Sequence, residues 1–251
     1  MQVTRFSLIG FILLLLSSLC AAGPLKYVVV STHTQPLADI TFINGQYHID
    51  KKSGFLVQLG VEISRALGME LEISTLPRQA VDKALLSGQA DIVCYLTPEW
   101  SSSIADKVDW SQAFMRSNDI LVSSSQIADI NKAHELKGMR IGLIKYYSYP
   151  LLDNLLSSNQ ITPVYSSSEA SNFMTLFKNR QPDAIVLKEL TYEWLSHNHA
   201  RLVSKTRTKV HPLIIEYAEP QCAVSRHKKL NLSTINQGID NFKFKYGFDS
   251  Q

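Results

Sequence analysis

The chain has 251 residues, of which 45% are hydrophobic and 19% charged, an ordinary composition for a globular protein. Its 25 Lys and Arg against 22 Asp and Glu give a formal net charge of +3, too small to indicate a nucleic-acid partner. Eleven Gly and nine Pro are too few for a low-complexity or collagen-like chain. We therefore expect one large folded domain or two smaller lobes.

The first 22 residues have the three-part pattern of a secretory signal. Arg5 supplies a positive charge, Leu8–Leu16 is an apolar run, and small residues follow up to Ala22. The run is shorter than the roughly 20 residues that a membrane span needs. We expect cleavage after Ala22 and export. Lipoprotein anchoring through Cys20 is the alternative, which the bulky Leu19 before it disfavours.

Strands and helices alternate along the first half of the remaining chain. Tyr27–Ser31 is a continuous β-branched run, typical of a strand that is covered on both faces. Apolar residues recur at helical spacing over Gly54–Leu67, and Gly68 is typical of a helix end. The pattern then predicts a strand at Leu71–Thr75, a helix from Pro77 to Ser87 and a strand at Ala90–Leu96.

A second unit of the same kind follows the Ser-rich passage at Ser123–Ser125. It predicts strands at Met139–Ile144, Pro163–Tyr165 and Asp183–Leu187, with helices at Tyr149–Leu156 and around Phe173–Phe177. The tail predicts a strand at Cys222–Ser225 and a helix around Leu232–Phe242. This repeated alternation predicts an α/β protein with two lobes, each built on a mostly parallel sheet.

The order of these elements also predicts where the lobes join. If the tail returns to the first lobe, the chain crosses between lobes twice, near residues 119–123 and 217–222. The expected first lobe is then residues 23–119 with 220–251, and the second is residues 120–219. Two crossovers make a hinge with a cleft between the lobes.

Several segments resemble the bacterial extracellular solute-binding proteins of family 3, the amino-acid-binding type. They are Gly54–Leu67, Leu85–Ile92, Thr97–Glu99, Lys137–Gly142 and Asp183–Val186. The resemblance implies the two-lobed periplasmic-binding fold, with helices on both faces of its sheets. It also implies a periplasmic monomer that takes a small-molecule ligand and passes it to an inner-membrane ABC permease, or reports it to a membrane sensor.

Two positions depart from the pattern of that family. Trp100 follows Thr-Pro-Glu where the amino-acid binders usually have the Arg that holds the ligand's carboxylate, and Lys188 stands where they often have an acid. The ligand is therefore not expected to be an ordinary α-amino acid. Lys188 together with Arg78 favours an anion, whereas Glu189 would favour a cation. The sign stays open, with a preference for an anion.

The candidate ligand residues follow the ends of predicted strands, where α/β proteins bind ligands. Thr97 can form a hydrogen bond, Tyr95 and Trp100 offer flat faces, and a turn at a helix start suits an anionic group. Ordinary alternatives are a core role for Trp100 and a surface ion pair for Arg78. The candidates are His33, Gln35, Arg78, Tyr95, Thr97, Trp100, Tyr147, Ser148, Lys188 and Glu189.

Signatures of catalysis are thin. The sequence has no G-x-S-x-G, H-E-x-x-H, P-loop or C-x-x-C motif, so we expect a binding protein without a cofactor. His197, His199 and His211 do not form a convincing metal-ligand pattern, and no metal is expected. One rival is an exported enzyme on the same scaffold, similar to cyclohexadienyl dehydratases, with Glu99 or Glu189 as acid or base. The other is a ligand-free interaction module that contacts a membrane sensor.

Two cysteines remain after cleavage, Cys94 and Cys222. An exported protein reaches an oxidising compartment, where the two can pair. In the fold implied by the resemblance their strands would be neighbours. A disulfide and a pair of buried thiols are the two alternatives.

Overall fold

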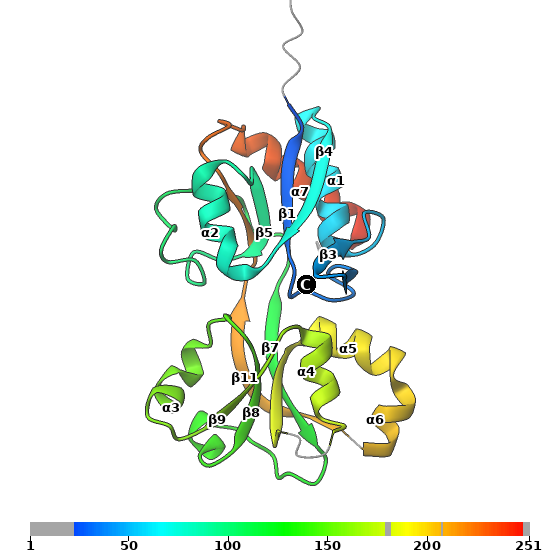
Figure 1. Cartoon of the computed structure of the whole chain (residues 1–251), viewed down its shortest axis with the longest axis vertical. Helices are drawn as coiled ribbons and strands as arrows, with labels where there is room; N and C mark the ends of the chain where they lie inside the picture. Colours follow the sequence, from blue (N-terminus) through cyan, green and yellow to red (C-terminus); the bar gives the residue numbers. More distant parts are fainter. Residues whose placement is uncertain (1–22, 179–181, 207, 248–251) are drawn as a thin grey trace, which may run out of the picture.

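The computed structural model describes residues 23–178, 182–206 and 208–247. The expected signal segment and Cys20 lie outside this range. Figure 1 shows two lobes, one above the other, with strands β7 (Ser117–Ser124) and β11 (Thr208–Ala218) running between them. Among the described residues, no helix is long and apolar enough to cross a bilayer.

The first lobe is built on a five-stranded sheet in the order β4-β1-β5-β12-β6. The residues of β1 alternate between its two faces. Tyr27 and Val29 pack with α1 and α7, while Val28 and Val30 pack with α2, so the strand is covered on both sides. The elements of this lobe are β1 (Leu25–Val30), β2 (Ile40–Ile43), β3 (Gln46–Ile49), α1 (Phe55–Leu67), β4 (Leu71–Leu76), α2 (Arg78–Ser87), β5 (Ile92–Leu96), β6 (Asp109–Trp110), β12 (Gln221–Val224) and α7 (Leu232–Tyr246).

The second lobe has a sheet in the order β11-β7-β10-β8-β9. Ile185 and Leu187 on β10 pack with Phe173 and Leu195 from α4 and α5, while Val186 faces the other side. The further elements of this lobe are η1 (Ala133–Leu136), β8 (Arg140–Ile144), η2 (Pro150–Leu152), α3 (Asp153–Ser157), β9 (Thr162–Ser166), α4 (Glu169–Thr175), β10 (Ala184–Lys188), α5 (Glu189–Asn198) and α6 (Ala200–Thr206).

Each sheet has a parallel part and an antiparallel part. β1 is parallel to β4 and β5, and β8 is parallel to β9 and β10, as the alternation predicts. β12 is antiparallel to β5, and β7 is antiparallel to both β10 and β11. The sheets are thus mixed rather than mostly parallel, because the segments next to the lobe crossings return against the direction of the βαβ strands.

Some local elements differ from the sequence-based expectation. Tyr149 does not begin a helix, because its side chain turns into the core and its hydroxyl accepts a hydrogen bond from the Ile144 N–H at 2.9 Å. A short 3₁₀ turn and the five-residue α3 follow. The hairpin β2–β3, the strands β6, β7 and β11, and the helices α5 and α6 were not predicted. The hairpin is largely exposed, so it lacks the strict alternation that marks a half-buried strand.

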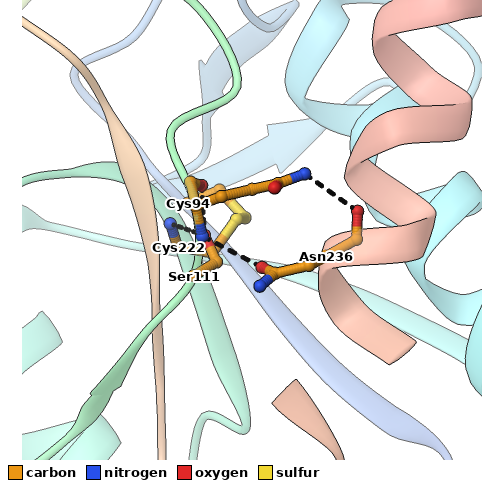
Figure 2. The surroundings of a disulfide bond; sticks show 5 residues. Cys94, Ser111, Cys222 and Asn236 are labelled. Carbon is orange, nitrogen blue, oxygen red and sulfur yellow. Dashed lines mark hydrogen bonds between the residues drawn. A yellow bond between two sulfur atoms is a disulfide. The ribbon is translucent and has the colours of Figure 1, made fainter. Parts of the chain in front are cut away.

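A disulfide between Cys94 and Cys222 ties the returning segment to the first lobe. The two residues are partners in the register of β5 and β12. Figure 2 shows Ser111 beside them: its hydroxyl accepts a hydrogen bond from the Cys222 N–H at 2.8 Å. The adjoining Gln112 N–H donates to Asn236 on α7 at 2.9 Å. The covalent loop spans 128 residues and encloses the whole second lobe.

Loss of this disulfide should destabilise the protein without changing its secondary structure. Closing so long a loop restricts the unfolded chain, so replacing Cys94 and Cys222 together by Ala should lower the free energy of unfolding by about 3–5 kcal/mol. Urea unfolding followed by circular dichroism measures the difference. Wild-type protein with and without reductant is the control, and equal midpoints in both would contradict the prediction.

Candidate ligand-binding cleft

A cleft of about 230 Å³ lies between the lobes. Its wall combines strand ends of the first lobe, the two crossing strands and strand ends of the second lobe, the places where α/β folds bind ligands. The lining residues are Val30, His33, Arg78, Tyr95, Leu96 and Trp100 from the first lobe, Asp119 and Glu216 from β7 and β11, and Tyr146, Tyr147, Ser148 and Lys188 from the second lobe.

The most deeply buried charge in the cleft wall is that of Lys188. Its side chain is 4% exposed, and its Nζ donates at 2.5 Å to the Oε1 of Glu169, which is 1% exposed. The same Nζ lies 4.5 Å from the ring centre of Tyr147 and 5.4 Å from that of Tyr95. Burial alone would lower the pKa of Lys188, but the Glu169 carboxylate and the other negative groups hold it well above its usual range. Lys188 is therefore a charged group that already has its counter-ion.

Three residues in register form the floor of the cleft. Asp119 on β7 is the register partner of Lys188 on β10 and, on its other side, of Glu216 on β11. The Asp119 side chain is buried, and burial raises the pKa of its carboxyl group. Burial also raises the pKa of Glu216, and the charge of Asp119 adds to this effect.

Contacts across the cleft join the two lobes directly. The Thr32 and Tyr147 hydroxyl groups are 2.9 Å apart, and the Trp100 indole N–H donates to Glu216 Oε1 at 2.7 Å. Tyr95 reaches from β5 to Ser117 at the start of β7, with 2.5 Å between their oxygens. The structure thus has the lobes drawn together around the cleft.

Tyr95 and Tyr146 have a strained backbone in this cleft. Their φ angles are 66° and 69°, in the left-handed region that residues with a side chain rarely adopt. Such strain persists only where the surrounding structure enforces it, and it concentrates at binding and active sites. Tyr95 is the penultimate residue of the buried strand β5, and Tyr146 comes two residues after the end of β8; both residues line the cleft.

His33 contributes a neutral ring to the wall. It is 4% exposed, and burial together with the charge of Lys188 holds its pKa well below the usual value. Its Nδ1 lies 3.5 Å from the Tyr147 hydroxyl. Its Nε2 is buried and has no hydrogen-bond partner among the described residues.

Seven of the ten candidate ligand residues line this cleft. They are His33, Arg78, Tyr95, Trp100, Tyr147, Ser148 and Lys188. The Arg78 guanidinium is, however, engaged with the protein itself: it donates to Asp82 at 2.8 Å, to the Trp100 carbonyl at 2.8 Å and to Ser101 at 2.9 Å. Arg78 therefore braces the loop that presents Trp100.

The other three candidates are not among the lining residues, and each has a local partner. Gln35 donates to Ser53 at 2.5 Å. The Thr97 hydroxyl accepts from the Trp100 N–H at 3.2 Å. Glu189 is exposed and accepts from Asn118 at 2.8 Å.

Sequence reasoning missed Asp119, Glu216 and Tyr146 as cleft residues, and Glu169 as the partner of Lys188. Asp119 had been placed at the first crossover, and that position was the available signal for a cleft residue. Glu216 lies in a strand that the sequence pattern did not predict. Glu169 is 19 residues from Lys188 and is brought to it only by the packing of α4 on β10.

Comparisons with known proteins agree on the architecture. No family model and no curated protein matches the chain. An ancestral arginine-binding protein bound to arginine is 20% identical with a TM-score of 0.68, over 91% of this chain and 95% of that one. The chain has the two-lobed fold of solute-binding proteins.

Two further solved structures share this fold. An amino-acid ABC transporter substrate-binding protein from Streptococcus pneumoniae, bound to L-arginine, is 19% identical with a TM-score of 0.68, over 89% of this chain and 90% of that one. A histidine kinase sensor domain with similarity to periplasmic binding proteins is 16% identical with a TM-score of 0.68, over 91% and 94%. At these identities the likeness is one of fold.

The Lys188–Glu169 pair gives a direct test of the cleft wall. Glu169→Gln leaves a buried ammonium without its counter-ion and should lower the free energy of unfolding by about 3–5 kcal/mol. The double variant Lys188→Met with Glu169→Gln removes both charges and should recover most of that loss. Urea unfolding of the wild type, the single variant and the double variant measures these free energies of unfolding. A single variant as stable as the wild type would show that Lys188 does not depend on Glu169.

Proposed function

We propose that this chain is an exported solute-binding protein that traps a small polar molecule between its lobes. The observation that carries the proposal is the cleft itself, which strand ends of both lobes and both crossing strands line together. Its volume of about 230 Å³ is below the roughly 300–1,000 Å³ of sites for drug-sized ligands. The solute is therefore a small metabolite.

Hinge closure is the proposed mechanism of binding. The two lobes are connected only at β7 and at the end of β11 in the described chain, so they can rotate about these segments. A solute that accepts and donates hydrogen bonds to both lobes adds its own contacts to those of Thr32 with Tyr147 and Trp100 with Glu216. It stabilises the closed state by the difference in its affinity for the two states.

Export and delivery complete the proposal. The secretory pattern of residues 1–22 supports a periplasmic location, and the Cys94–Cys222 disulfide suits that oxidising compartment. The fold it shares with an ABC transporter substrate-binding protein supports delivery of the solute to an ABC-type permease. The likeness to a histidine kinase sensor domain supports a second candidate, in which the closed form signals to a membrane sensor.

Trp100 should be needed for binding but not for folding. A thermal-shift screen of amino acids, dicarboxylates, polyamines and aromatic acids identifies the solute, since a ligand at 100 times its Kd adds about 2.7 kcal/mol. Trp100→Ala removes an aromatic face and the contact to Glu216, and should weaken binding at least about tenfold. Trp110→Ala, in the first lobe outside the cleft lining, is the matched control. Equal affinity in both variants would remove Trp100 from the site.

The enzyme alternative predicts turnover and is tested separately. Glu99 is exposed and Glu189 is bonded to Asn118, and neither is among the residues that line the cleft. We therefore expect no aromatic product when the protein is incubated with prephenate or arogenate and the ultraviolet absorbance is followed. Product formation that is lost in the Glu99→Gln or Glu189→Gln variant would overturn the pure-binding proposal.

A further inference from the structure

The charges around the cleft do not cancel. Both cations that line it have a carboxylate of their own: Lys188 pairs with Glu169 and Arg78 with Asp82. Asp119 and Glu216 also line the cleft, and no described residue forms an ion pair with either. The cleft therefore carries two carboxylates in excess.

The positions of these two carboxylates make the excess negative charge destabilising. Asp119 and Glu216 are register partners on neighbouring strands, so their side chains leave the sheet at the same place. Like charges directly opposite each other are destabilising in a sheet, and a buried charge without a partner costs free energy. Asp119 is only 8% exposed, and Lys188, its register partner on the other side, attracts its carboxylate but forms its ion pair with Glu169. Burial raises the pKa of both groups, and the charge of Asp119 adds to this effect at Glu216, whereas the charge of Lys188 opposes it at both.

Three neighbouring groups suit a cation at this place. The neutral ring of His33 has its buried Nε2 without a partner, and in the tautomer with a free lone pair there it can accept a hydrogen bond. Tyr95 and Trp100 have their ring centres 6.2 Å apart at an angle of 31°, which forms an aromatic wall beside the carboxylates. Aromatic faces attract organic cations as well as apolar groups.

We propose that the solute is an organic cation, an inference that rests on the proposed function. Its ammonium or guanidinium group lies between Asp119 and Glu216, and its carbon skeleton lies against Trp100 and Tyr95. This reverses the preference for an anion drawn from Lys188 and Arg78, because the fold neutralises both of these residues. The described residues hold no group of three or more His, Cys, Asp or Glu side chains fit for a metal ion, which favours an organic cation over an inorganic one.

The test compares probes of similar skeleton and opposite charge. Isothermal titration of the mature chain with phenethylamine, putrescine and agmatine is set against 3-phenylpropionate and adipate. We expect at least one of the three cations to bind, and to do so at least tenfold more tightly than either anion. Asp119→Asn and Glu216→Gln should each weaken that cation at least tenfold. Asp106→Asn and Glu193→Gln neutralise exposed carboxylates outside the cleft lining and should leave its affinity unchanged.

The ligand-free protein provides a second readout that needs no probe. Asp119→Asn removes a buried carboxylate that forms no ion pair among the described residues, so the melting temperature of this variant without ligand should be higher than that of the wild type at neutral pH. A site built for a cation thus loses affinity and gains stability through the same substitution. Substitution of a residue with a merely structural role would lower both the affinity and the stability.

The outcomes separate this inference from the proposed function. If an anion binds more tightly than the cations and Asp119→Asn strengthens it, the cation inference is overturned and the solute-binding proposal stands. The same holds if none of the three cations binds while a neutral or acidic solute from the wider screen does. If no solute of any charge binds, both fail. A melting temperature that falls in Asp119→Asn would also count against the cation site.

Discussion

The pairing of β7 with β11 is the constraint on which the cleft depends. These two strands hydrogen-bond to each other within the second lobe and lead from it toward the first, so both lobe connections belong to one antiparallel ribbon. The register of that ribbon with β10 places Glu216, Asp119 and Lys188 in one row. The hinge and the floor of the binding site are therefore the same residues, and a charge bound at the floor acts directly on the segments about which the lobes move.

The first lobe has to hold the chain that returns from this ribbon in a fixed position. Its sheet accepts the returning chain as β12, and the Cys94–Cys222 disulfide and the bonds of Ser111 anchor that strand next to β5. β5 ends at Tyr95 and Leu96, both of which line the cleft. Fixing β12 therefore also fixes the strand end that presents the aromatic wall. The second lobe can then move against a first lobe whose half of the site keeps its geometry.

Much of the fold follows from local sequence patterns, and the elements that these patterns specify could be predicted. The β-branched run of β1 and the buried run of β10 have the composition that two-sided burial selects, and Gly68 ends α1 in the left-handed conformation expected of a helix C-terminus. Strand ends then predicted most of the cleft residues. What the sequence did not reveal depends on contacts between distant segments. The partner of Lys188 comes from the start of another helix, and Glu216 enters the site through the register of a strand with no clear period of its own.

The charge of the ligand shows why such distant contacts matter for function. A lysine at a strand end and an arginine at a helix start, taken alone, favour an anion. In the folded chain each meets a carboxylate within 3 Å, and the arginine's remaining donors bind the loop of Trp100. Asp119 and Glu216 are the lining carboxylates that form no ion pair among the described residues, so the electrostatic preference of the cleft has the opposite sign. What a binding site selects is set by the charges that the fold leaves uncompensated, and these follow from the pairing of the side chains rather than from the list of them.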